Sequence, residues 1–119
     1  MTNKLAAAVT VLGVAMGVQS VRAQKVSADG AMQTFNYLAD QFFSEVYFKF
    51  SPTAGTAAGL HQYDAKLEDY SAAGVAAEVA ALHEFEKKVE AIDPAALDAP
   101  AAADREILLN NIKSDAAKA

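Results

Sequence analysis

Apolar side chains recur along two parts of this chain with the period of an α-helix. Between residues 32 and 50 they occupy Phe35, Leu38, Phe42, Val46 and Phe50. After Ser71, which can cap a helix, they occupy Val75, Val79, Leu82, Phe85, Val89 and Ile92. Steps of three and four residues place such side chains on one face of a helix. The pattern therefore predicts helices over residues 32–50 and 72–92.

Turn and cap residues predict shorter elements between and after these two helices. Ser51 can cap a helix that begins at Pro52, and Gly59 can end it, which predicts a helix over 52–59 and an irregular connection over 60–64. Asp93-Pro94 begins a short turn, Ala99-Pro100 breaks the chain again, and a last helix is expected from Asp104 onward. No repeat and no strand pattern is present. The expected fold is all-α, a small antiparallel helical bundle.

Aromatic residues are concentrated in the helix predicted over 32–50. This segment holds seven of the ten aromatic residues, and Phe43, Tyr47 and Phe48 lie on a second face beside the apolar one. We favour a core helix that packs on two sides, because Phe and Tyr at helical spacing usually report burial. An aromatic platform for a ligand is the alternative.

The amino-terminal residues have the layout of a secretory signal peptide. Lys4 precedes an uncharged run from Leu5 to Val18, and small side chains precede a cleavage site expected after Ala23. At 1.5 Å per residue the run spans about 21 Å, less than the roughly 30 Å of a bilayer core. We therefore expect a signal peptide over 1–23, a flexible leader over 24–31, a helical region over 32–119, and no permanent membrane span after cleavage. An uncleaved anchor or a buried helix is the alternative.

Composition narrows the class of protein. Twenty-eight of the 119 residues are alanine, and cysteine is absent, which excludes a disulfide framework, a thiolate zinc site and a cysteine nucleophile. Fifteen acidic against ten basic residues give a net charge of −5, so nucleic acid is not an expected partner. An exported chain without disulfides suits a bacterial periplasm or the cell exterior.

The sequence assigns no catalytic, cofactor-binding or metal-binding residue to this chain. A zinc-protease helix needs a second histidine four residues after His83, and that position is Lys87. His61, Tyr63 and Asp64 lie in the predicted connection. Turn formation and capping explain these three residues as well as a binding role does.

One stretch resembles a known family. Ser51-Pro52, Gly55-Thr56, Gly59, His61, Tyr63-Asp64, Leu67, Asp69 and Ser71 together resemble the amino-terminal region of the bacterial family called domain of unknown function 885, with Ile92-Asp93-Pro94 closing the likeness. The resemblance covers about residues 35–112. It implies an exported, all-helical, zinc-metallopeptidase-like protein that acts on peptides. The family usually has alanine where Gly55 stands, and it carries its His-Glu-x-x-His zinc helix far downstream, where no position here matches it.

Two functions are consistent with these features. In the first, the chain is the N-terminal helical fragment of a longer exported metallopeptidase-like protein, whose missing C-terminal part is its partner and holds the zinc. In the second, it is a complete small exported module that binds a partner and catalyses nothing. The excess of aromatic residues and the last helix, which has no stop signal, favour the first.

Overall fold

The computed structural model describes residues 29–119, so the expected signal peptide and cleavage site lie outside the described residues. The first element is a continuous helix over 29–50, called the N-terminal helix below. It comprises an α-helical part over 29–41, the π-helical stretch η1 (Phe42–Tyr47) and the short α2 (Phe48–Phe50). Residues 29–31, which the sequence assigns to the flexible leader, are helical.

The π-helical stretch follows from the spacing of the apolar residues. Four residues of an ideal α-helix turn through about 400°, so a run of steps of four drifts off the buried face. A π-helical turn is wider because its N–H groups bond to carbonyls five residues back, as Phe48 N–H does to the carbonyl of Phe43. The wider turn keeps both Phe42 and Val46 buried on the same side.

The next element, α3 (Pro52–Ala57), confirms the predicted short helix and its stop. Gly59 has a φ of 81°, and the N–H groups of Leu60 and Gly59 donate to the carbonyls of Gly55 and Thr56, both at 2.9 Å. This is a Schellman end, in which glycine adopts a left-handed φ without strain from a Cβ.

The start of α3 differs from the expectation. The Ser51 side chain makes no capping hydrogen bond. The carboxylate of Glu68, which arrives from the linker 64–71, accepts the N–H of Thr53 at 3.1 Å and also its hydroxyl. A residue 15 positions away in the sequence therefore supplies the cap.

The two carboxyl-terminal helices form an antiparallel hairpin. It follows the 3-10 turn η2 (His61–Tyr63) and the linker, and consists of α4 (Ala72–Glu90), the turn η3 (Pro94–Ala96) and α5 (Ala99–Lys118). Ser71 caps α4 as expected, accepting the Gly74 N–H at 3.0 Å.

The start expected for the last helix, at Asp104, is wrong by five residues. Asp98 caps α5 by accepting the Ala101 N–H at 2.9 Å. Pro100 lies in the first turn, where a backbone N–H is not needed. Pro100, which we interpreted as a break in the chain, is therefore part of the helix.

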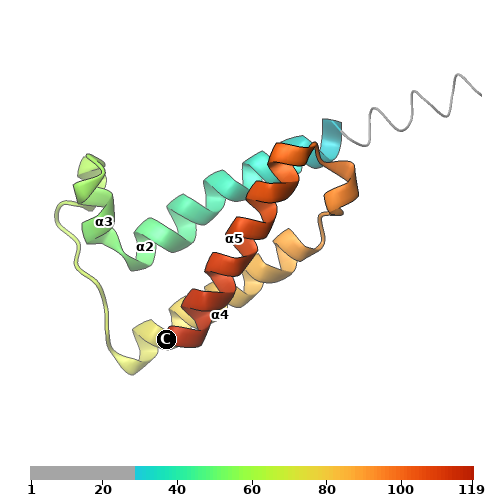
Figure 1. The fold of residues 1–119 in the computed structure, drawn as a ribbon. Helices are drawn as coiled ribbons and strands as arrows, with labels where there is room; N and C mark the ends of the chain where they lie inside the picture. Colours follow the sequence, from blue (N-terminus) through green and yellow to red (C-terminus); the bar gives the residue numbers. More distant parts are fainter. Residues whose placement is uncertain (1–28) are drawn as a thin grey trace, which may run out of the picture.

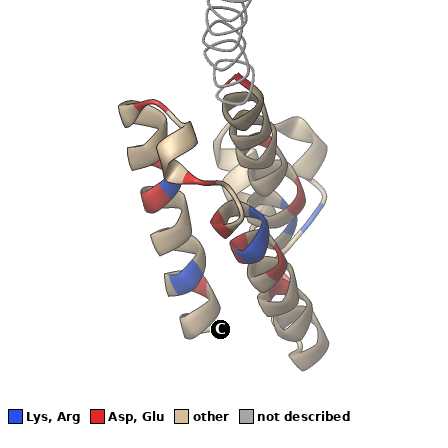
Figure 2. Ribbon diagram, turned by 90° about the vertical axis from the view of Figure 1, so that its right-hand side faces the viewer, with Lys and Arg blue, Asp and Glu red and all other residues tan. Residues whose placement is uncertain are grey.

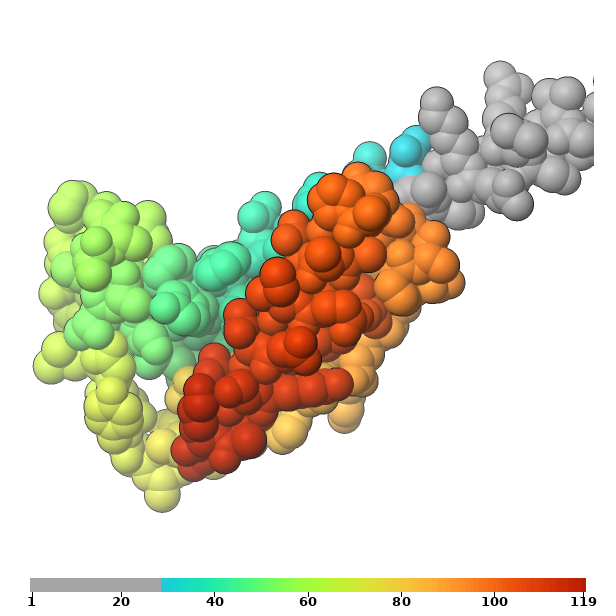
Figure 3. Space-filling view, viewed as in Figure 1, coloured from blue at the N-terminus to red at the C-terminus, as the bar shows by residue number. Residues whose placement is uncertain are grey.

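The N-terminal helix packs against this hairpin, so three long helices run alternately up and down (Figure 1). The all-α expectation is confirmed. The core is made of residues from all three helices and of Ile92 just beyond α4, namely Phe35, Leu38, Phe42, Val46, Leu82, Phe85, Val89, Ile92, Ala101, Leu108, Leu109 and Ile112. In the space-filling view, α3 and the linker stand away from the end of this bundle (Figure 3). No helix within residues 29–119 is long and apolar enough to cross a membrane.

Arg105 is the buried charged residue of the described chain. Its Nε donates to the carbonyl of Ile92 at 2.9 Å, and its Nη2 donates to the carbonyl of Glu90 at 3.3 Å. These carbonyls lie at and just beyond the end of α4, where no helical N–H reaches them. Arg105 thus caps α4 from α5, and an ion pair with the more exposed Glu106 balances its charge.

Arg105→Met should lower the free energy of unfolding by about 1–3 kcal/mol, because methionine fills the space but leaves both carbonyls without a donor. Urea unfolding of the purified chain, followed by far-UV circular dichroism, measures this loss. Lys87→Met, on the exposed face of α4, is the control and should change stability by less than about 0.5 kcal/mol. Equal stability of the two variants would contradict the capping role.

Candidate functional site

The turn that carries the family-like residues is held by a ring packed on a glycine. Tyr63 of η2 is buried, and its ring centroid lies 5.7 Å from that of Phe48. A Cβ on Gly55 would lie 2.6 Å from Cδ2 of this ring. Tyr63, Phe48 and Gly55 thus form a small packed cluster beside the main core. This packing favours a structural role for Tyr63 over a binding role.

His61 and Asp64 form an exposed pair across the same turn. Nδ1 of His61 lies 3.0 Å from Oδ2 of Asp64, and the His61 side chain is 88% exposed. His83 pairs with Glu86 in the same i,i+3 relation at 3.1 Å on the surface of α4. The two histidines belong to separate elements, and among residues 29–119 neither pair has a third ligand beside it.

The described residues do not fit a zinc centre. Within 29–119, no group of three His, Asp or Glu side chains is placed to hold a metal ion. A catalytic zinc needs three protein ligands and an open position. The zinc implied by the family resemblance therefore has no site among these residues, and no step of a zinc reaction can be assigned to them.

Two carboxylates fix the linker by accepting hydrogen bonds. The hydrogen bonds from Thr53 lower the pKa of Glu68, and those from Ser71 lower the pKa of Asp69. A carboxyl whose pKa is lowered by folding stabilises the fold above its ordinary pKa. The stabilisation is lost as the pH falls through the lowered value, so these linker contacts weaken in acid.

The second face of the N-terminal helix is only partly buried by the described residues. Its rings touch one another from the main core outward, Phe42 against Phe43, Phe43 against Tyr47, and Tyr47 against Phe48. Phe43 is 48% exposed and Tyr47 is 41% exposed. The expected packing on a second side is therefore present at Phe48, whose ring lies against Tyr63, and absent at Phe43 and Tyr47 within the described part of the chain.

We call Phe43, Tyr47 and Ile107 the aromatic face. Ile107 of α5 is 59% exposed and lines, with Phe43, a groove of about 310 Å³ between α5 and the N-terminal helix.

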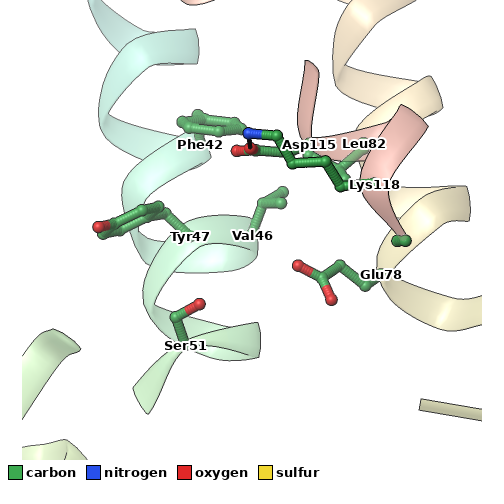
Figure 4. Close-up of a pocket in the computed structure, with 9 residues that line it drawn as sticks. Phe42, Val46, Tyr47, Ser51, Glu78, Leu82, Asp115 and Lys118 are labelled. Atoms are coloured by element: carbon green, nitrogen blue, oxygen red, sulfur yellow. Dashed lines mark ion pairs between the residues drawn. The ribbon is translucent and has the colours of Figure 1, made fainter. Parts of the chain in front are cut away.

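Two further hollows lie along the bundle. One, of about 350 Å³, opens at the end of the bundle, where the Glu78 side chain reaches from α4 toward the N-terminal helix and Asp115 pairs with Lys118 at 3.6 Å (Figure 4). The other, of about 530 Å³, lies between the N-terminal helix, the linker and α4 and is called the lysine cleft below.

The part of the chain from α3 through α5 is similar to a known family. A family model described as a bacterial protein of unknown function (DUF885) matches residues 52–119. The chain belongs to this family. The match covers more than half of the chain and runs from the start of α3 through α5, which confirms the resemblance. Comparison with curated proteins and with solved structures gives no match.

Sequence reasoning missed the residues that organise this region of the DUF885 chain. It treated Gly55 as a minor departure from the family, although the ring of Tyr63 occupies the space of its side chain. It did not single out the lysines of the lysine cleft, because Lys49, Lys66 and Lys88 come from three separate segments. The sequence signal for the contact between Gly55 and Tyr63 was a tyrosine that follows, eight positions later, a glycine in a helix of small residues.

Gly55→Ala should lower the free energy of unfolding by about 1–3 kcal/mol, because the new methyl group displaces the Tyr63 ring. Gly30→Ala is the matched control, since open space surrounds that position. The control should leave stability unchanged or raise it by up to about 1 kcal/mol. Chemical denaturation gives the stability of each variant. Unchanged nuclear Overhauser contacts between the Tyr63 and Phe48 rings in Gly55→Ala would contradict the close packing.

Proposed function

We propose that this chain is the N-terminal, non-catalytic helical part of an exported DUF885 protein with metallopeptidase-like activity. The observation that carries the proposal is the aromatic face. Rings that continue from the core to the surface, with Phe43 and Tyr47 left exposed, are typical of a surface that another part of a protein covers. The occupant is the C-terminal part of the same protein.

The chemistry assigned to the longer protein follows from the family resemblance. A His-Glu-x-x-His helix in that part would hold zinc, and peptides would be the substrates. The helices described here frame the active part and contribute no ligand, in keeping with the poor fit of residues 29–119 to a metal centre.

A complete small exported binding module is the second candidate. The closed core favours it, since Val89 and Ile112 are fully shielded by the three helices alone. In that case the aromatic face would receive a separate protein instead of a later part of the same chain.

The coding DNA beyond Ala119 separates the two candidates. Continuation into a His-Glu-x-x-His helix, with stoichiometric zinc binding by the longer product and none by the 119-residue chain, supports the proposal. A stop codon supports the binding module. A tight one-to-one zinc site in the short chain that His61→Ala abolishes would contradict the placing of zinc outside it.

The double variant Phe43→Gln/Tyr47→Gln tests the aromatic face in both lengths of the protein. In the longer protein it should lower the free energy of unfolding by more than about 3 kcal/mol, because burial of both rings is lost. In the 119-residue chain the loss should be under about 1 kcal/mol, since exposed positions tolerate substitution. Tyr70→Gln, at a largely exposed tyrosine of the linker, is the control in both. Equal small losses in the two lengths would argue against coverage by the same chain.

Export predicts a mature protein that begins at Gln24. The charged start, the uncharged run and the small residues before the cut motivate this site. Mass spectrometry of the protein recovered from the periplasm or medium should show a first residue of Gln24. Intact Met1 in the membrane fraction would support the uncleaved anchor instead.

A further inference from the structure

The groove between the N-terminal helix and α5, called the apolar groove below, has accessible apolar walls. Phe35 and Leu108 form its buried floor, while Phe43 and Ile107 are 48% and 59% exposed. All of its lining residues belong to these two helices, so it lies on the side of the pair that faces away from α4. An open groove with exposed apolar side chains is typical of a surface that receives an apolar partner.

The other contacts between long helices offer no comparable surface. Ion pairs cross the contact between α4 and α5, where Nζ of Lys113 lies 3.0 Å from Glu90 and 3.8 Å from Glu86. In the lysine cleft, between the N-terminal helix and α4, Val46 and Phe85 are only 2% and 4% exposed. A further helix would therefore bury the most apolar surface in the apolar groove.

The directions of the helices define how a fourth helix would fit. In Figure 1 the N-terminal helix and α5 run in the same direction, α4 runs opposite to them, and α5 ends where α4 begins. A helix that follows α5 after a short connection runs back antiparallel to it, and in the apolar groove it would complete an up-and-down bundle of four helices. The apolar groove and the hollow at the end of the bundle together follow α5 from Asp104 to Lys118, about 21 Å or four helical turns.

The free charges along these two hollows are negative. Asp104 lines the apolar groove and Glu78 lines the hollow at the end of the bundle, and no ion pair among residues 29–119 involves either carboxylate. Lys118 lines the same end hollow, but it pairs with Asp115. Figure 2 shows acidic and basic residues interspersed along the helices of the chain, whose net charge is −5. A helix that complements these hollows therefore carries basic side chains near both ends of its apolar stripe.

We infer that an amphipathic helix of about four turns, which follows α5 in the same protein, lies antiparallel to α5 in the apolar groove. Its apolar stripe packs on Phe43 and Ile107, and its basic side chains pair with Asp104 and Glu78. The inference rests on the proposed function, in which the protein continues beyond Ala119. It adds the kind of element that covers the aromatic face, the direction of that element and its charge.

Photo-crosslinking in the longer protein tests the position and direction of this helix. With p-benzoylphenylalanine in place of Ile107, mass spectrometry should locate the links in one segment beyond residue 119 that has apolar residues at steps of three and four and Lys or Arg beside them. With the same group at Asp104 or at Lys118, the links should lie near the end or near the start of that segment, about 14 residues apart. Placed at Lys87, on the exposed face of α4, the group is the matched control and should give no link to the segment.

Links from Ile107 to a segment without this pattern, to a second copy or to a separate protein would overturn the inference. So would the reverse order of the links from Asp104 and Lys118, or the absence of any link beyond residue 119. The proposed function has its own measurement, the stability loss of Phe43→Gln/Tyr47→Gln in the longer protein, so coverage by another kind of segment is distinguishable from no coverage. A stop codon after Ala119 would overturn both. Far-UV circular dichroism shows that each labelled variant keeps its helices.

Discussion

A single buried guanidinium joins the two helices of the hairpin on which the bundle depends. Arg105 belongs to the first half of α5, yet its donors reach the carbonyls of Glu90 and Ile92 at the end of α4. The carbonyls at a helix end need partners, and a buried one without a partner destabilises the fold. Because α4, α5 and Ile92 just beyond α4 supply eight of the twelve core residues, fixing the relative position of the two helices also fixes the surface against which the N-terminal helix packs. The packing of the core therefore depends on the cap that Arg105 provides.

The apolar periodicity predicted the helices themselves because burial on one face is a local property of the sequence. Phe35 to Val46 and Leu82 to Ile92 are buried as their spacing indicated. Caps were less predictable where the partner is distant. Ser71 and Asp93 accept hydrogen bonds from residues two or three positions on, but Ser51 is replaced as a cap by Glu68. Pro100 was misinterpreted because a proline marks a first helical turn as readily as a break.

The candidate site was less accessible to sequence reasoning than the fold, because its contacts join segments that are far apart in the chain. His61 and Asp64 are neighbours, and their pairing follows from the turn. The fit of Tyr63 against Gly55 and the meeting of Lys49, Lys66 and Lys88 need the path of the linker. That path depends on where Glu68 and Asp69 find hydrogen-bond donors. The spacing of apolar residues in the sequence carries no information about the path of the linker.

The linker therefore joins α3 to the helical hairpin of this DUF885 chain through its two carboxylates. Glu68 holds it to α3 and Asp69 holds it to the start of α4, so the position of Lys66 above the Tyr63 ring depends on both carboxylates. Protonation in acid weakens these two contacts. The linker is therefore held most firmly above the ordinary pKa of the two carboxyl groups, where both are charged.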